Sequence, residues 1–438
     1  MRPKPKFRAT VSWILYDFAN TAYSMNVVSL YFVTWIIIDL GQNDFFVSLA
    51  NSLSMILVAL FMPVLGDWSD WRGKKLSPLF GFTVVCILGT LSLGILGRSI
   101  DQPALLLPLV FFVFVVANFA YQGGLVFYNA LLPVVSTPRT LGRVSGYGVA
   151  LGYLGAIIGL MVAGIFVDGS FFAIEVPFVD AGGTISAFIP TAILFALFAI
   201  PIFIFVKEPA VESRAPQGWS IIKSYKKIIH TLRDTQKYPG LARFLIAKFF
   251  YEDSIQTVII YMGVYTQTVM GFSLAEAKLF FVVVIPSAVV GSAVCGILTD
   301  HYGPKRTLIA VIAFWVLCLM VVVLNSSSLV FWILGTIIGA LLGSTWTAAR
   351  PLLVSLVPQE MLGEFFGLYA LSGKVAAILG PLVWSSVTFL LIEFTIVIRY
   401  RVAIAVLAVL MLIGLLILRG VPDYHSRYKF SQKQDHRV

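Results

Sequence analysis

Twelve long apolar segments divide this chain of 438 residues, and they constrain its fold more than any other feature. Each approaches the ~20 residues that an α-helix needs to cross the hydrocarbon core of a bilayer. Only 12% of the residues are charged, against roughly 25% in a soluble domain, so the chain requires lipid as its solvent. The sequence therefore predicts an all-α membrane protein with twelve transmembrane helices. The segments lie at 11–38, 45–65, 77–97, 104–131, 142–167, 186–206, 243–269, 277–298, 307–324, 328–350, 363–391 and 402–418.

Lysine and arginine residues concentrate in every second loop. Most of the 31 lie in the two tails, in the 207–248 stretch, or in the loops at 66–76, 132–143 and 299–306. Because cytoplasmic loops are enriched in these residues, we expect a multi-pass protein of the cell membrane with both termini in the cytoplasm. This placement explains the net charge of +10 as a topology signal, so we expect the lipid bilayer and no nucleic acid as a partner. The opposite loops hold only Arg98, Lys278, Arg399 and Arg401.

One long polar stretch, 207–242, separates the first six apolar segments from the last six. Within it, SIIKSYKKIIHTLRDTQ has apolar residues at helical spacing with lysines between them, which is typical of an amphipathic helix on a membrane surface. We expect an N-terminal six-helix bundle at 1–206, a cytoplasmic linker at 207–242, and a C-terminal bundle with its tail at 243–438.

Two internal repeats indicate that the halves are related. The loop GDWSDWRGKK contributes Gly66, Asp70, Gly73 and Lys75, which recur with identical spacing in the second half as Gly296, Asp300, Gly303 and Lys305. A second set also keeps its spacing between the halves, and it consists of Leu141, Gly142, Gly146, Gly152, Ile157 and Gly159 with Leu362, Gly363, Gly367, Gly373, Ile378 and Gly380. A repeat of half the chain predicts two pseudo-symmetric bundles. The glycines are typical of closely packed membrane helices.

Ionisable side chains occur in selected apolar segments only. An ionisable group inside a membrane is costly and suggests a functional site. The third, sixth, ninth and twelfth segments have none, and the fourth has uncharged polar residues, among them Tyr121, Gln122 and Asn129. This pattern predicts helices around a water-filled cavity, with every third helix outside. Charged residues within the other segments include Asp17, Lys248, Glu252, Asp253, Arg350 and Lys374.

The charges of the second half allow two interpretations. Asp253 and Lys374 are both predicted near the membrane midplane, so they could form a structural ion pair. Alternatively, Asp253 exchanges a proton or holds a cationic group, while Lys374 holds an anionic one. Lys248 and Glu252 are four residues apart on one helix and could simply neutralise each other.

Two further positions are candidates for solute contact. Asp17 is followed one turn later by Asn20 and has aromatic neighbours, among them Tyr23. An acid and an amide among aromatic rings suit a polar organic ligand, although packing near the inner mouth is the alternative. Arg350 offers a planar fork for a carboxylate or phosphate. It could equally lock a closed gate against a carboxylate such as Glu364.

The repeated G-x-x-x-D-x-x-G-x-K loop resembles the signature loop of the major facilitator superfamily, although Trp71 and His301 stand where a basic residue is usual. YDFANTAY at 16–23, LGYLGAIIG at 151–159 and EFFGLYALSGKVAAILGP at 364–381 narrow the resemblance to the group of vacuolar autophagy-related amino-acid effluxers and their bacterial members. This resemblance implies alternating access without ATP hydrolysis. It also implies that Asp70, Arg72 and the counterparts near Asp300 stabilise an outward-open state. We assign Arg143 and Glu364 to the same conformational gate.

The sequence favours a secondary transporter, a symporter or antiporter, for a small polar solute that resembles an amino acid. Asp17, Asn20, Tyr23, Tyr121, Gln122, Asn129, Arg350 and Lys374 would contact the solute. Asp253, or Glu252, would carry a coupling proton. A lipid or drug exporter and a non-transporting scaffold are the alternatives, and the scaffold predicts an Asp253–Lys374 pair. We expect a monomer without cofactor or metal, and no ATPase, protease or redox motif suggests an enzyme.

Overall fold

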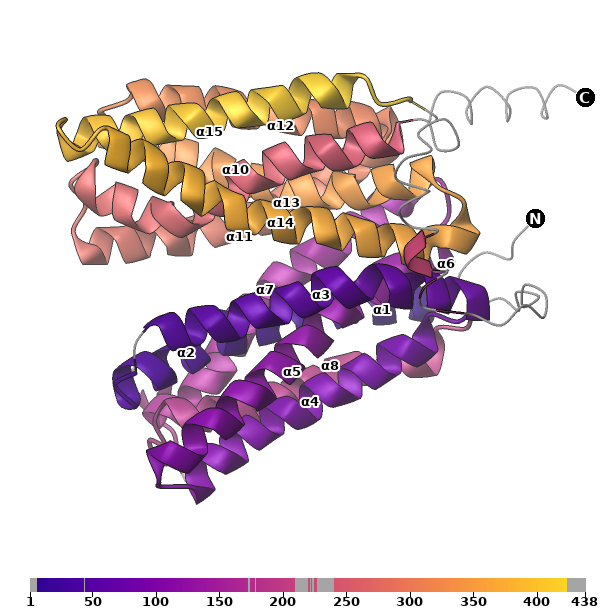
Figure 1. Ribbon diagram of the computed structural model, residues 1–438, viewed down its shortest axis with the longest axis vertical. Coiled ribbons are helices and arrows are strands. Elements are labelled where there is room, and N and C mark those ends of the chain that lie inside the picture. Colours follow the sequence, from indigo (N-terminus) through magenta and orange to yellow (C-terminus); the bar gives the residue numbers. More distant parts are fainter. Residues whose placement is uncertain are drawn as a thin grey trace, which may run out of the picture. The chain divides into compact units, whose positions relative to one another are not determined.

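The computed structural model describes residues 6–42, 44–171, 174–177, 179–208, 220, 222, 224–226 and 240–423. Long helices account for most of this part of the chain (Figure 1). The amphipathic helix predicted in the 207–242 linker falls largely outside the described residues. By contacts, the chain groups into two compact units, 1–138 with 151–219, and 139–150 with 220–438. The domain boundaries proposed from the sequence differ from these at 139–150 and remain a prediction.

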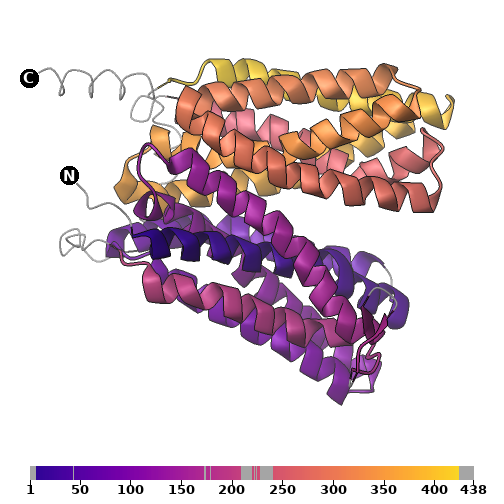
Figure 2. The same cartoon turned by 180° about the vertical axis from the view of Figure 1, so that it is seen from behind.

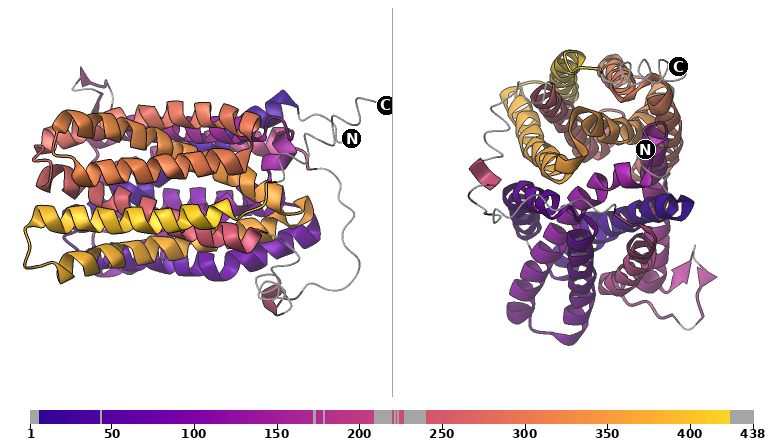
Figure 3. Two further views of the ribbon diagram at one scale, coloured as in Figure 1. Left: turned by 90° about the horizontal axis from the view of Figure 1, so that it is seen from above. Right: turned by 90° about the vertical axis from the view of Figure 1, so that its right-hand side faces the viewer.

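The N-terminal unit is built from long helices that pack against both consecutive and sequence-distant partners. α1 packs against α8, and α5 packs against both α3 and α4. Figure 2 shows α8 in pink beside α1 in indigo. Their bounds are α1 Phe7–Tyr23, α3 Asp44–Arg72, α4 Leu76–Ser99, α5 Pro103–Ala130, the short α6 Leu132–Val135, α7 Leu141–Asp168 and α8 Phe188–Phe205. Two-residue strands, β1 Ser170–Phe171 and β2 Ile174–Glu175, pair antiparallel after α7 and appear as arrows in Figure 3. η3, Thr184–Ala187, leads into α8.

The first membrane segment departs from α-helical geometry after α1. It continues through a π-helix η1 (Ser24–Tyr31), a single turn α2 (Phe32–Thr34) and a second π-helix η2 (Trp35–Asp39). The Asn26 amide within η1 donates hydrogen bonds of 2.9 Å to the Gly159 carbonyl and to the Thr191 hydroxyl. This segment differs from an ordinary membrane helix. π-helical turns are rare and occur frequently at functional sites.

Residues 240–423 of the second unit, all of which the structure describes, form six long helices that run alongside one another (Figures 1 and 3). α10 packs against α14 and α15, and α13 packs against α11 and α12. The Ser273 side chain and Glu276 form a reciprocal capping box at the start of α11, which fixes where that helix begins. The bounds are α10 Leu241–Thr268, α11 Leu274–Tyr302, α12 Pro304–Leu324, α13 Ser328–Leu356, η4 Gln359–Met361, α14 Leu362–Leu390 and α15 Ile396–Arg419.

The helices match the twelve predicted membrane segments. Eleven helical spans in the described chain are long and apolar enough to cross a bilayer. The remaining predicted segment is the 28-residue α10, which is not among those apolar spans and carries Arg243, Lys248, Glu252 and Asp253. The predicted all-α membrane fold is confirmed.

Candidate functional site

Each copy of the repeated loop has a glycine with a positive φ between its two helices. Gly73 has φ +66° between α3 and α4, and Gly303 has φ +92° between α11 and α12. L-residues with a side chain seldom adopt this left-handed region, so glycine at both positions lets the chain reverse direction within a few residues. In the first copy the Lys75 ammonium lies 3.1 Å from the Asp70 carboxylate. The Arg72 guanidinium lies over the Trp68 ring at 4.9 Å.

The start of α4 is capped by a residue that the sequence did not single out. The Glu208 carboxylate accepts hydrogen bonds from the backbone N–H groups of Lys75 at 2.6 Å and Leu76 at 3.0 Å. First-turn N–H groups have no partner within their own helix, so a carboxylate there satisfies them and favours the helix dipole. Glu208 follows α8, far from α4 along the chain, and no local pattern links the two.

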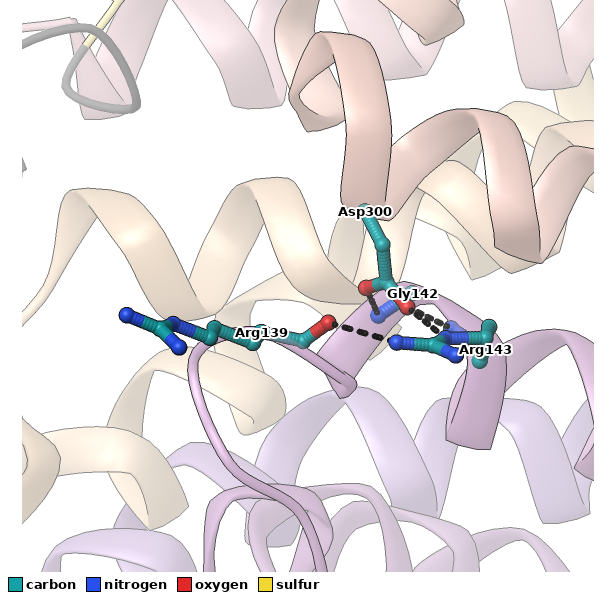
Figure 4. A network of polar contacts seen from close by, with 4 residues as sticks. All are labelled: Arg139, Gly142, Arg143 and Asp300. Carbon is teal, nitrogen blue, oxygen red and sulfur yellow. Dashed lines mark hydrogen bonds and ion pairs between the residues drawn. The ribbon is translucent and has the colours of Figure 1, made fainter. Parts of the chain in front are cut away.

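The second copy binds the first turn of α7 (Figure 4). The Asp300 carboxylate accepts hydrogen bonds from the N–H of Gly142 at 2.7 Å and from the N–H of Arg143 at 3.2 Å. It also forms an ion pair of 2.7 Å with the Arg143 guanidinium, which in turn donates to the Arg139 carbonyl at 3.3 Å. Asp300 thus holds a helix N-terminus by two backbone bonds and one charge pair. The structure brings Arg143 and Asp300 of the predicted gate together.

Glycines let α7 approach α11 at backbone distance beside this network. A Cβ on Gly142 would lie 2.7 Å from the Gly296 carbonyl oxygen, and one on Gly146 would lie 2.5 Å from the Ser292 carbonyl oxygen. The Ser145 hydroxyl donates to the Thr347 carbonyl at 2.9 Å. Small residues are therefore required on this face of α7 for the Asp300 contacts to form. All of these groups belong to the second compact unit.

The middle of α10 carries a buried ion pair. The Lys248 ammonium pairs with the Glu252 carboxylate, as their four-residue spacing predicted. The same ammonium lies 4.0 Å from the centre of the Tyr369 ring of α14. On α14 a Cβ at Gly373 would lie 2.8 Å from the Lys248 nitrogen and 2.9 Å from a Glu252 oxygen. Gly373 thus makes space for the pair.

Asp253 does not form the predicted alternative pair with Lys374. Asp253 is 3% exposed, and its Oδ1 has no hydrogen-bond partner in the described chain. Lys374 forms no ion pair or hydrogen bond with any residue that the structure describes. The structural salt bridge considered from the sequence is therefore absent here, and with it the arrangement that a non-transporting scaffold predicted. Asp253 lies instead against Gly380 of α14 and Thr257, whose hydroxyl donates to the Asp253 carbonyl at 2.8 Å.

The contacts of repeated glycines on α7 and α14 show which residues of the first half correspond to which residues of α10. Gly152 of α7 contacts Asp17 and Thr21, and its repeat mate Gly373 contacts Lys248 and Glu252. Two helical turns further along α7, Gly159 contacts Ala22 and Asn26. At the equivalent position of α14, Gly380 contacts Asp253 and Thr257. The sequence interval from each contacted residue of the first half to its counterpart on α10 is the same in all four cases. By this internal symmetry an acid, Asp17, corresponds to a base, Lys248.

The candidate residues of the N-terminal unit lie among aromatic rings. Trp13 stacks on Tyr128 at 4.4 Å between ring centres, and its indole N–H donates to the Tyr128 carbonyl. Tyr23 and Tyr121, both predicted, have ring centres 4.8 Å apart. Of the remaining predicted positions, Asp17 is 5% exposed, Asn20 is 2% exposed, and Gln122 and Asn129 are half-buried. Among these candidates, the buried amide atoms Asn20 Nδ2 and Asn129 Oδ1 have no hydrogen-bond partner in the described chain.

The two other gate candidates lie on neighbouring elements of the second unit. Arg350 is half-buried on α13. Glu364 is completely buried in the first turn of α14. Lys248 was not predicted as a site residue from the sequence, because its four-residue spacing to Glu252 suggested only that the two charges neutralise each other.

Comparison with known proteins agrees with this architecture. A family model described as "Vacuole effluxer Atg22 like" matches residues 42–429. The "Uncharacterized MFS-type transporter YxiO" of Bacillus subtilis is 29% identical over 436 residues, which cover 97% of each chain. The "Multidrug resistance protein MdtG" of Yersinia enterocolitica is 25% identical over 353 residues, covering 78% of this chain and 76% of the relative.

Solved structures show the same fold. The crystal structure of the E. coli fucose:proton symporter superposes with a TM-score of 0.71 at 13% identity and covers 94% of this chain and 97% of its own. The family match, the transporter relatives and the fold agree with one another. The chain therefore belongs to the Atg22-like vacuole effluxer family of major facilitator transporters.

Proposed function

We propose that this protein is a secondary active transporter that moves a small polar organic solute by alternating access, coupled to protons. Membership of a transporter family supports movement of a solute. Groups of both signs within the second unit, such as the buried Asp253 and the half-buried Lys374, would supply a counter-charge for each end of a solute that resembles an amino acid. The proposal also includes a single chain as the functional unit.

The observation that supports proton coupling is the burial of the Asp253 carboxyl group without a full set of hydrogen bonds. A carboxylate that is 3% exposed and leaves one oxygen without a hydrogen bond is costly as an anion inside a membrane. Binding a proton removes that charge, and a cationic solute group would compensate it. Either event changes the stability of the helix pair α10 and α14, because Asp253 lies against Gly380. Glu252 is the alternative carrier of the proton.

Gradient-driven uptake into proteoliposomes tests the proposal. A panel of amino acids is offered under an imposed pH gradient, and Asp253→Asn is compared with the wild type. We expect the variant to retain solute exchange without a gradient and to lose accumulation driven by the gradient. The exposed Asp101, which precedes α5, provides the matched control Asp101→Asn, which should accumulate solute normally. Accumulation by Asp253→Asn at the wild-type level would remove Asp253 from the coupling role.

An exporter of drugs or other amphiphiles is the second candidate. The stacked rings of Trp13, Tyr16 and Tyr128 in the N-terminal unit favour it, since aromatic faces bind flat or cationic apolar molecules. The likeness to the relative named as a multidrug resistance protein favours it as well. Loss of an amphiphilic dye from loaded vesicles distinguishes the two. Dye export that competes with no amino acid would favour this candidate over the first.

A further inference from the structure

Three helix ends of the second unit meet beside the last turn of α15. α15 packs against both α10 and α12. The Arg243 guanidinium, in the first turn of α10, donates to the Gly420 carbonyl at 3.0 Å. The Lys305 ammonium, in the first turn of α12, donates to the Arg419 carbonyl at 2.9 Å. Because consecutive residues repeat at ~3.8 Å, the two cationic groups lie within ~10 Å of each other.

The internal repeat shows that the contact of Lys305 with α15 is particular to the second half. In the first copy of the loop, Lys75 pairs with Asp70 at 3.1 Å. In the second copy, Asp300 is occupied by the first turn of α7 and by Arg143, and Lys305 donates to α15 instead. An ammonium has three N–H donors, of which the described chain uses one on Lys305. The remaining donors are available to a further acceptor.

The charges at this end of the unit do not cancel within the described chain. Arg306 pairs with Asp423 at 3.1 Å, so these two contribute no net charge. The exposed Arg419 side chain forms no ion pair or hydrogen bond with any described residue. Arg243, Lys305 and Arg419 therefore remain as three cations. The end of the α15 dipole opposes them with only about half a negative charge.

Other acids near these helix ends in the sequence do not supply the missing charge. Asp300 is paired with Arg143. Glu360 of η4 and the completely buried Glu364 of α14 form no ion pair with any of the three cations. The flanking sequences, 230–239 and 424–438, contain more lysine and arginine than aspartate and glutamate. This end of the unit is therefore strongly basic.

Exposed apolar side chains continue from the basic residues along the two apolar helices. On α15 they follow Arg419 at intervals of three and four residues, so they share its face. On α12 they follow Arg306 on one face in the same way. They are Leu416 (54% exposed), Leu412 (40%) and Val409 (53%) on α15, with Phe314 (56%) and Leu317 (57%) on α12. In a membrane-spanning helix such side chains face acyl chains, whereas the cations at the helix ends lie at the level of the headgroups.

We propose that the end of α15 is a binding site for an anionic phospholipid, with its phosphate held by Arg243, Lys305 and Arg419 and its acyl chains along α15. Basic pockets between membrane helices bind such headgroups, and a guanidinium matches the geometry of a phosphate. A zwitterionic phospholipid brings a cation of its own into the same cluster and should bind more weakly. The site is separate from the transported solute, so it stands whether or not the proposed transport function does.

Thermal-shift titrations of the purified full-length protein in detergent test this inference. The probes are phosphatidylglycerol, phosphatidylcholine as the zwitterionic lipid, and glycerol 3-phosphate as a phosphate without acyl chains. We expect phosphatidylglycerol to raise the melting temperature with a saturable dependence on concentration, because a ligand stabilises the state that it binds. The other two probes should have much smaller effects at the same concentrations. An equal effect of glycerol 3-phosphate would assign the cluster to free phosphate and overturn the lipid as occupant.

Two substitutions of opposite sign separate binding from folding. Arg419→Gln removes a cation with no described partner and should raise the half-saturating concentration of phosphatidylglycerol about fivefold. Asp423→Asn releases Arg306 and should lower that concentration about fivefold, a gain that damage to the fold does not produce. The control is Lys207→Gln, which removes an exposed cation after α8 in the first unit and should change nothing.

Three outcomes would overturn the inference. The first is stabilisation by phosphatidylcholine that equals stabilisation by phosphatidylglycerol. The second is a loss of affinity in Lys207→Gln as large as that in Arg419→Gln, which would indicate attraction to the overall positive charge of the protein. The third is an affinity for phosphatidylglycerol that neither Arg419→Gln nor Asp423→Asn changes.

Discussion

Replacement of Asp300 by asparagine should release the first turn of α7. The carboxylate of Asp300 accepts two backbone hydrogen bonds and pairs with the Arg143 guanidinium at 2.7 Å. Asparagine keeps one acceptor oxygen and presents its NH₂ group to the remaining donors. A hydrogen bond to a charged group contributes ~1.5–3 kcal/mol, and the Arg143 side chain is 45% exposed, which reduces its share. We therefore expect a loss of about 2 kcal/mol, or about thirtyfold in the opening equilibrium.

Hydrogen–deuterium exchange of the protein in lipid nanodiscs measures this directly. The amides of Gly142 and Arg143 lie in a first helical turn, where no intrahelical acceptor protects them. Their protection comes from Asp300, so their exchange should accelerate by about thirtyfold in Asp300→Asn. Asp423→Asn is the control, because it affects an ion pair with Arg306, whose side chain is 66% exposed. Unchanged protection of the two amides in Asp300→Asn would refute the assignment of this contact.

Two further predictions concern the contact between α10 and α14 and the start of α11. Gly380→Ala would bring a methyl group against the Thr257 hydroxyl and within 2.9 Å of the Asp253 carbonyl, so melting of the protein should reveal a loss of about 1–3 kcal/mol. Gly81→Ala is the control, because its methyl group would meet nothing within 4 Å, and it should be neutral or slightly stabilising. Equal melting temperatures for the two variants would contradict the close contact of Gly380 with α10. Hydrogen bonds from the Ser273 backbone and side chain lower the pKa of Glu276 below its ordinary value of 4.5, so the capping box contributes stability above that value. That contribution should disappear as the pH falls through the lowered pKa, seen as a lower protection factor, relative to the intrinsic exchange rate at each pH, for the amides of Ser273 to Glu276. A protection factor that does not change with pH would contradict the cap.

Apolar length and the repeated loop sufficed to predict the membrane segments and the turns between them. Runs of about twenty apolar residues leave few alternatives to a spanning helix, and the Gly73 and Gly303 turns follow from the conformational needs of glycine. The two π-helices were not predicted. The apolar pattern of a π-helical turn is too close to that of an α-helical turn for a periodicity argument to distinguish them.

The candidate site was predictable in composition and less so in its contacts. The Lys248–Glu252 pair followed from local spacing, since residues four apart share a helix face. The partners of Asp300 and Glu208 are backbone N–H groups, which have no sequence signature. The correspondence of Asp17 with Lys248 was hidden for another reason. Residues of opposite charge do not align, and only their contacts with Gly152 and Gly373 reveal the register.

Proton movement driven by solute alone tests the transport proposal most directly. Purified protein is sealed into liposomes with a pH-sensitive dye, and an inward gradient of each amino acid is applied with no pH gradient and no ATP. The proposal expects at least one solute to change the internal pH at a rate that depends on the protein, and Asp253→Asn to abolish that change. Solute entry at full rate with a constant internal pH would contradict proton coupling.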